Sequence, residues 1–144
     1  MFFPEFLYRL SARDEKVTWL DPRNERIVVI LANAQVNADV SVPDSQVLIL
    51  MAAQVTGLPG LAQNVASNLL QIIPPGQANS MELKRQSAAL AANVISDLDW
   101  QGEIIVPPDW TVRAAVAYNA GAVNNETRLS LFGILIPVAN IQRI

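Results

Sequence analysis

The chain has 144 residues, of which 51% are hydrophobic and 16% are charged, and its net charge is −3. It contains no cysteine and no histidine, which excludes disulfides, thiolate metal sites and thiol nucleophiles, together with the commonest general base and metal ligand. The length fits one domain. We therefore expect no enzyme activity, no catalytic or metal site and no cofactor.

The distribution of charge and hydrophobicity limits the partners. The ten Lys and Arg residues are spread along the chain without a basic run, so binding to nucleic acid through its phosphates is not expected. The longest apolar run, Val47–Ala53, is far shorter than the ~20 residues of a membrane-spanning helix. The charged fraction is below the usual ~25%. This predicts either apolar surface that meets a partner, in a homo-oligomer, or a well-filled core beneath an amide-rich exterior.

Residues 1–24 differ from the rest of the chain because they mix aromatic residues with charges and two prolines. One interpretation is an arm whose aromatic side chains dock on a neighbouring chain, and the other is a terminal strand or turn that covers the domain's own core. We predict the arm, since its aromatic residues follow no clean period. The predicted partner-binding residues are Phe2, Phe3, Phe6, Tyr8, Arg9 and Arg13.

Residues 25–144 are predicted to form the β domain. The β-branched segment Arg26–Ala34 indicates a central strand buried on both faces. A turn at Asn37–Asp39 and a short edge strand at Val40–Val42 are expected next. Gln46–Val55 is the following strong strand, and a Gly-Leu-Pro-Gly turn closes it.

The middle of the chain leaves two questions open. Residues 61–73 match a helical period but are rich in asparagine and end at a Pro-Pro-Gly sequence, so a strand and a short helix are both possible. Asn79 and Glu82 then have the spacing of a capping box, and leucines among alanines follow them. These features predict a helix over residues 81–95. The alternative is a strand pair that turns near Ala91–Asn93.

The second half predicts further strands. A short strand at Glu103–Val106, a Pro-Pro-Asp turn and a longer strand at Trp110–Tyr118 follow one another. One face of the longer strand is apolar and predicted to be buried: Val112, Ala114, Val116 and Tyr118. The last strand, Thr127–Pro137, contains Gly133, where a bulge or a close backbone approach is expected. Together the strands predict a mainly β fold, an antiparallel β-sandwich of jelly-roll type.

Two groups of residues are candidates for a ligand site. Asp97, Asp99 and Glu103 form an acidic cluster, but they lack the spacing of a calcium loop and fit a polar turn. Trp100 and Trp110 are candidate ligand-binding aromatics for a sugar. Their other interpretation is that they anchor the core of the sandwich, with Trp110 at its rim and the Trp110 indole N–H bonded to a backbone carbonyl.

The segment IIVPPDWTVRAAVAYNAG, the strand LSLFGILIPVANIQRI and the earlier VSVPDSQVLILMAAQVTG share a pattern of proline turns followed by sandwich strands. In this pattern the chain resembles small β-sandwich virion proteins of tailed bacteriophages, and most of all a capsid decoration (cement) protein. The resemblance covers about residues 40–60 and 100–140.

The resemblance implies a structural protein that is made in the host cytoplasm and attached to the outer capsid surface of the virion. Its partner would be the major capsid protein, whose neighbouring subunits it would clamp, and it would form a homotrimer in preference to a dimer. The predicted arm suits such a clamp. The alternative function is a receptor- or carbohydrate-binding β-sandwich module of a head fibre or a tail.

Overall fold

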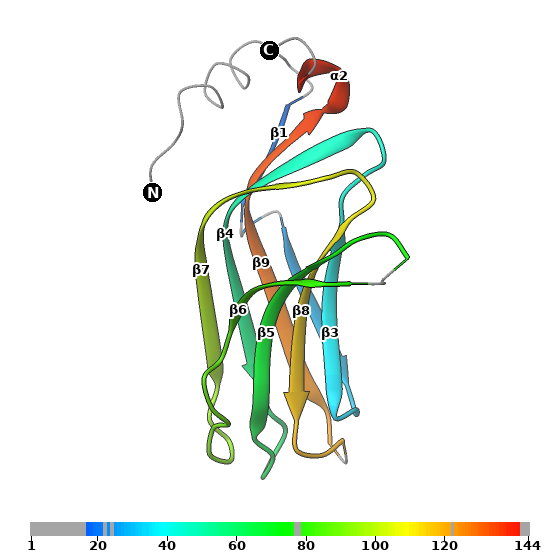
Figure 1. Ribbon diagram of the computed structural model, residues 1–144. Coiled ribbons are helices and arrows are strands. Elements are labelled where there is room, and N and C mark those ends of the chain that lie inside the picture. The colour runs from blue at the N-terminus through cyan, green and yellow to red at the C-terminus, as the bar shows by residue number, and fades with distance from the viewer. Residues whose placement is uncertain (1–16, 22, 24, 77–78, 122, 142–144) are drawn as a thin grey trace.

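The computed structural model describes residues 17–21, 23, 25–76, 79–121 and 123–141. Within these residues nine strands form two antiparallel sheets, which face each other as a β-sandwich (Figure 1). The fold is therefore mainly β, as the alternating apolar segments predict.

The larger sheet has five strands and is organised around β9 (Asn125–Pro137). On one side β9 pairs with β4 (Gln46–Leu58), which in turn pairs with β7 (Ser96–Val106). On its other side β9 pairs first with β2 (Arg26–Leu31) and then, further along, with β1 (Thr18–Leu20). The two long strands β4 and β9 thus form the centre of this sheet.

The smaller sheet has the strand order β3-β8-β5-β6. Its strands are β3 (Gln35–Ser41), β8 (Thr111–Tyr118), β5 (Val65–Ile73) and β6 (Met81–Arg85). A single helical turn, α2 (Val138–Ile141), follows β9 and lies at the same end of the molecule as β1 (Figure 1).

The main core lies between the two sheets. All four residues of the predicted face of β8 are buried, so the period-2 pattern there is confirmed. Tyr118 ends this face: its hydroxyl donates to the Glu126 carbonyl oxygen at 2.6 Å, and burial raises the pKa of that hydroxyl. The largest fully buried side chains opposite and around this face are Leu48, Leu50, Leu70, Ile72, Leu129 and Leu131.

Gly133 marks an irregularity in the central pair of strands, as expected. The register between β4 and β9 shifts between Leu50 and Ala52, directly opposite Gly133. A Cβ atom at Gly133 would collide with the backbone oxygen of Ile49. The close approach of the two backbones therefore requires glycine at this position.

Two predictions in the first half are wrong. Arg26–Leu31 is not a central strand buried on both faces, because β2 pairs only with β9 among the described strands and exposes Val28 and Ile30. Asn37–Asp39 is not a turn but part of β3, which bonds to β8 along its whole length. The residues of a strand do not determine which other strands it pairs with. The same apolar or polar segment can therefore form an edge strand or a central strand.

The predicted helix over residues 81–95 is also wrong. Met81–Arg85 forms the strand β6 on the edge of β5, and the Leu90 N–H donates to the Val65 carbonyl oxygen at 3.0 Å. Pairing with β5 therefore outweighs the local helical preference. The alternative is correct in part: the chain turns at Asn93, whose φ is 62°, but β6 and β7 lie in different sheets. The ambiguous residues 61–73 contain β5.

The boundary of the predicted arm moves towards the N-terminus. Thr18–Leu20 is strand β1, and the Leu20 side chain belongs to the main core. The sandwich therefore includes residues from 17 onward, not from 25. The residues assigned to partner binding all lie outside the described part of the chain: Phe2, Phe3, Phe6, Tyr8, Arg9 and Arg13.

Candidate binding surfaces

The acidic cluster lies on β7, an outer strand of the five-stranded sheet. Asp97, Asp99 and Glu103 are exposed along β7, and the Asp97 carboxylate accepts a hydrogen bond from the Thr56 hydroxyl at 2.9 Å. Within the described residues no three His, Cys, Asp or Glu side chains come close enough to hold a metal ion. No helix in the described part of the chain is long and apolar enough to cross a membrane.

The outer face of the five-stranded sheet carries two adjoining shallow depressions. Gln54 lies between the core residues Ala53 and Val55 on β4, so its side chain points outward and borders both depressions. The first has a volume of about 260 Å³, and its outward side chains come from Ala52, Gln54, Asp99, Gln101, Ser130 and Phe132. The second, of about 400 Å³, adds the guanidinium groups of Arg26 and Arg128. Both are open; the lining of the first is mostly apolar, whereas the lining of the second is mostly polar and charged.

An aromatic pair lies beside the first depression. The rings of Trp19 on β1 and Phe132 on β9 have centroids 6.1 Å apart and are tilted by 42°. Trp19 is 40% exposed. The CH face of a sugar stacks on such rings while its hydroxyls bond to amides and carboxylates, so this surface is a candidate for glycan binding.

Beneath this pair is a second apolar cluster, separate from the main core. Ile49 and Met51 of β4 pack with Ile134 and Ile136 of β9 on the outer face of the sheet. Val17 and Phe132 pack against these four residues. We call the four the outer-face cluster. Val17, the residue directly before β1, thus contacts the outer-face cluster.

The sequence interpretation missed both Trp19 and the outer-face cluster. Trp19 lies in the segment assigned to the arm, and its contact with Phe132 depends on the pairing of β1 with β9. A signal for the cluster was available, because both alternating sets of residues in Leu131–Ile136 are apolar. A strand that is apolar on both faces must be covered on both.

The two candidate ligand-binding aromatics lie at the margin of the main core. Trp100 on β7 and Trp110, in the turn directly before β8, are partly buried and pack against it. The Trp100 ring lies over Gly102, where a Cβ atom would come within 2.9 Å of it. The Trp110 carbonyl oxygen accepts a hydrogen bond from the Val42 N–H at 2.9 Å, which joins the two proline turns. Trp100 is among the residues that line the first depression, whereas Trp110 lines neither depression. Their role as ligand-binding residues stays a prediction.

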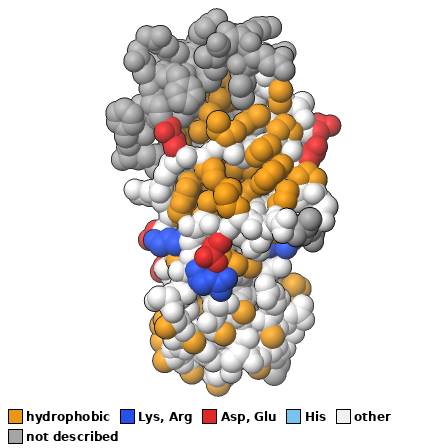
Figure 2. All heavy atoms as spheres, in the orientation of Figure 1, with side chains coloured by type: hydrophobic (Ala, Val, Ile, Leu, Met, Phe, Trp, Pro, Cys, Tyr) orange, Lys and Arg blue, Asp and Glu red, His pale blue; other side chains and the backbone are white. Residues whose placement is uncertain are grey.

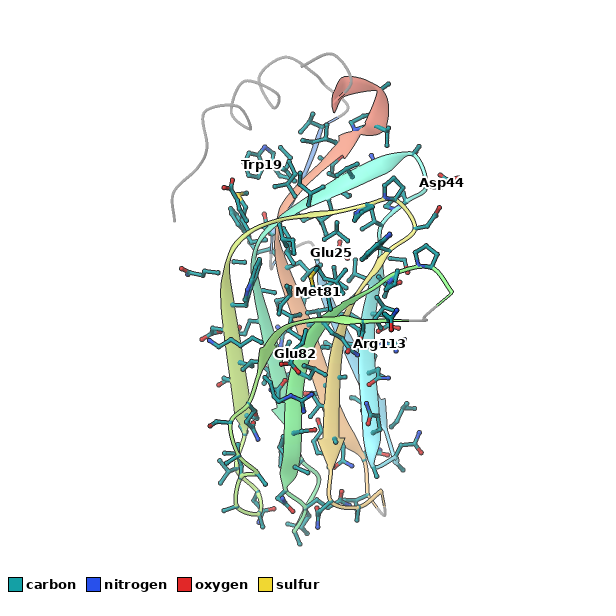
Figure 3. The ribbon with its side chains drawn as sticks, in the orientation of Figure 1. Trp19, Glu25, Asp44, Met81, Glu82 and Arg113 are labelled. Carbon is teal, nitrogen blue, oxygen red and sulfur yellow. The ribbon has the colours of Figure 1, made fainter. Side chains whose placement is uncertain are left out.

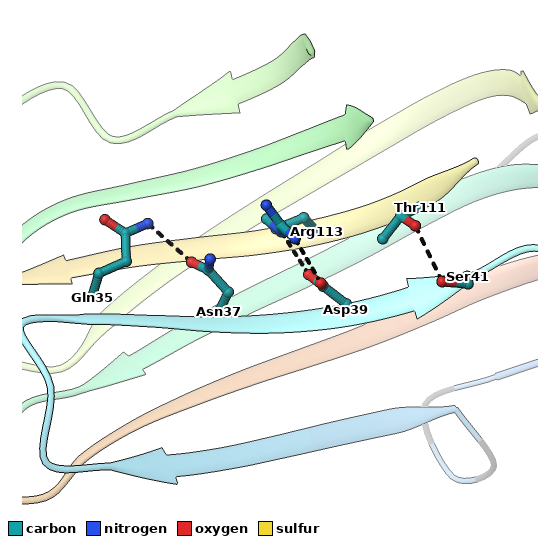
Figure 4. Close-up of polar contacts among 6 residues, drawn as sticks. All are labelled: Gln35, Asn37, Asp39, Ser41, Thr111 and Arg113. Carbon is teal, nitrogen blue, oxygen red and sulfur yellow. Dashed lines mark hydrogen bonds and ion pairs between the residues drawn. The ribbon is translucent and has the colours of Figure 1, made fainter. Parts of the chain in front are cut away.

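A polar row covers the outer face of β3 and β8 (Figure 4). Arg113 donates to both carboxylate oxygens of Asp39 at 2.8 Å, and this bonding raises the pKa of the guanidinium. Ser41 and Thr111 share a hydrogen bond of 3.1 Å, and Gln35 donates to Asn37 at 2.9 Å (Figure 4). The side chains of this row form hydrogen bonds with one another at exposed positions. The row is therefore the solvent-facing side of the smaller sheet.

Other parts of the surface are apolar. Figure 2 shows hydrophobic side chains gathered over the half of the viewed face that lies towards α2. Met81, which is 44% exposed, lies on this side at the front of the molecule (Figure 3). The described surface exposes further large hydrophobic side chains elsewhere: Val28, Ile30, Leu31, Leu61, Val94, Ile95, Ile105 and Val123. A contiguous apolar patch marks a contact with a partner, whereas single exposed hydrophobic side chains are common on protein surfaces.

The comparisons with known proteins yield only distant structural likenesses. No protein-family model and no curated protein matches the chain. Among solved structures it is similar to PirA, with 10% identity and a TM-score of 0.44 over 74% of this chain and 92% of that one. It is also similar to CBM32-1 from a family 31 glycoside hydrolase of Clostridium perfringens, with 10% identity and a TM-score of 0.39 over 70% and 78% of the two chains. A third is the cowpea mosaic virus top component, with 6% identity and a TM-score of 0.38 over 82% and 78%. Likenesses at these scores carry no argument about function.

Proposed function

We propose that this chain is a structural, non-enzymatic subunit that decorates the outer surface of a bacteriophage capsid and binds neighbouring subunits of the major capsid protein. The observation that carries the proposal is the apolar surface: ten large hydrophobic side chains of the described residues are 39–83% exposed. A protein partner that covers these side chains removes their cost in water. The resemblance of the sequence pattern to capsid decoration proteins is the reason for proposing the major capsid protein as the partner.

The root of the predicted arm is fixed to the sandwich, which supports a clamp. β1 bonds to β9 at Gly133–Leu135, Leu20 enters the main core and Val17 packs on the outer-face cluster. A load on the arm would therefore pass directly into the central strand of the five-stranded sheet. Residues 1–16, when extended, span at most ~58 Å at ~3.3–3.6 Å per residue, which is enough to reach an adjacent capsid subunit.

Removal of residues 1–16 is expected to abolish attachment to capsids while the domain stays folded. The truncation ends before β1, so it removes no strand of the described sandwich. Aromatic side chains bury large areas at modest entropic cost, and their loss removes the strongest anchors. The measurement is co-sedimentation of the truncated protein with bare capsids, together with its thermal melting curve.

A full-length variant with Phe2→Ser, Phe3→Ser and Phe6→Ser is the control for chain length. This variant should lose most of its binding to capsids, because the proposal assigns the affinity to the aromatic side chains and not to the length of the N-terminal segment. Full binding by the truncated protein would place the contact on the sandwich itself. A melting curve that collapses after truncation would mean that residues 1–16 serve the domain's own stability.

The aromatic pair beside the first depression favours a second candidate function, a carbohydrate-binding module. The chain has three tryptophans, so Trp100→Phe with Trp110→Phe leaves Trp19 as the only one. If a glycan binds in the depression, titration should change the Trp19 fluorescence in a saturable manner, and Phe132→Ser with Gln54→Ala should weaken binding by about tenfold or more. No change across a glycan panel at millimolar concentration would remove this candidate.

A further inference from the structure

We propose that the free edge of β2 is the docking site for a second copy of this chain. Two β2 strands would pair antiparallel about a two-fold axis, so that the five-stranded sheets of the two copies become one continuous sheet. The inference concerns self-association, and it assigns three of the ten exposed hydrophobic side chains, Val28, Ile30 and Leu31, to the second copy and not to the capsid partner. An isologous contact of this kind closes at two copies, so it favours a dimer over the trimer that the resemblance implies.

The backbone of β2 has groups available for this pairing. The Glu25 carbonyl oxygen accepts from the Leu131 N–H at 3.1 Å, and the register places Arg26 opposite Ser130. In an antiparallel ladder the residues that bond to one neighbour alternate with those that face the other side. The odd-numbered residues of β2 therefore bond to β9. Arg26, Val28 and Ile30 direct their N–H and C=O groups away from it, towards an edge that no described strand occupies.

The side chains of β2 make this edge attractive to another strand. Val28 is 46% exposed, Ile30 53% and Leu31 44%. Ile27 and Val29 point towards the main core but are only partly buried, because no strand lies beyond them. The segment contains no proline and no bulge, and Arg26 at its start is its only charge. An apolar, flat and unpaired edge is the form that pairs most readily with a further strand.

The other long edges of the two sheets carry the charges that prevent such pairing. The outer strand β7 exposes Asp97, Asp99 and Glu103. β6 exposes Glu82, Lys84 and Arg85, and the outward residues of β3 are polar. Charged edge strands are a common protection against unwanted strand addition. The contrast within one molecule indicates that the edge of β2 is left unprotected because a partner covers it.

The sequence of β2 is complementary to itself, which is the argument for a second copy as the occupant. When the two-fold axis passes beside Val29, Val29 faces its own symmetry mate. Val28 then faces Ile30 in a hydrogen-bonded pair, and Ile27 faces Leu31. Every facing pair within Ile27–Leu31 is apolar and mostly β-branched, the combination that stabilises cross-strand pairs. Arg26 falls opposite Ala32, so no like charges meet.

The test is the mass of the full-length protein in solution, measured by analytical ultracentrifugation at tens of micromolar. The parent should sediment as a dimer. Val28→Lys with Ile30→Lys, at two exposed positions of β2, should sediment as a monomer with a melting curve that still shows a folded domain. The matched control is Ile105→Lys, which changes a residue of β7 that is 62% exposed and should leave the dimer intact. A monomeric parent, or a dimer that survives both lysines, would overturn the proposal.

A cross-link tests the register without disturbing the edge. The Val29 pair is of the non-hydrogen-bonded type, with Cα atoms ~4.5 Å apart, which lies within the range of a disulfide. Because the chain has no cysteine, Val29→Cys should give a single covalent dimer on mild oxidation, visible on a non-reducing gel. Ile105→Cys should remain a monomer on that gel. Absence of a Val29→Cys cross-link, or equal cross-linking of both variants, would contradict the paired β2 edges.

Discussion

Replacement of Val116 by aspartate is expected to unfold the domain. Val116 lies on β8 between Val36 and Asn68 of the neighbouring strands and is fully buried. Across the sandwich its methyl group meets Gly57 of β4. No Lys or Arg is buried in the described part of the chain. A carboxylate at position 116 is therefore an unpaired buried charge, which costs several kcal/mol against a total stability of about 5–15 kcal/mol. Far-UV circular dichroism with thermal melting measures the effect.

The control is Ala117→Asp, one residue further along the same strand. Ala117 lies on the outer face of the smaller sheet and is half-buried, so its carboxylate can reach water. This variant should melt within a few degrees of the parent. If Val116→Asp melted like the parent as well, the face of β8 assigned to the core would be the wrong one.

Asn125→Ala is expected to destabilise one end of the sandwich by about 3 kcal/mol or more. The buried side chain of Asn125 holds three loops: its Oδ1 accepts from the Gly60 N–H at 2.8 Å, and its Nδ2 donates to the carbonyl oxygens of Asn33 and Ala120 at 3.0 Å. Alanine leaves all three backbone groups without this partner, at ~1–3 kcal/mol for each that stays buried. The melting temperature should fall by roughly 6–12 °C.

Asn124→Ala serves as the matched control, because it makes the same change at the exposed neighbouring residue. It should shift the melting temperature by no more than about 2 °C. Equal melting of the Asn125→Ala and Asn124→Ala proteins would show that the three loops hold their positions without the amide.

The strands were predictable where one face is buried and the other is not. β8 shows this directly, since its alternating residues carry the period of a half-buried strand and its flanking prolines fix its start. Gly133 was predictable for a similar reason: a glycine inside a strand is unfavourable unless something passes close to it. In both cases the signal lies within a few neighbouring residues.

The position of a strand within its sheet was not predictable in the same way. The apolar run of β2 suggested a central strand, but its neighbours are decided by pairing with β9 near the other end of the chain. The residues of β6 have a local preference for helix, which the free edge of β5 overrides. Both errors arise because long-range pairing adds a free energy that no local pattern contains.

The candidate surfaces were predictable only in part. The excess of apolar residues over charged ones predicts surface that meets a partner, and this stays a prediction; the structure shows that Ile30, Leu61 and Ile105 are exposed. The aromatic pair of Trp19 and Phe132 joins residues far apart in the chain, so its formation required the sheet. The prediction placed Trp19 in an arm, whereas β1 fixes it to the edge of the sandwich.

The central claim, the proposed attachment to a capsid shell, is tested most directly by quantitative mass spectrometry of purified phage particles. The account predicts this chain in a fixed stoichiometric ratio to the major capsid protein, and its loss from particles that are assembled with the protein lacking residues 1–16. Absence of the chain from purified virions, or its presence in only a few copies per particle, would contradict a shell-decorating role.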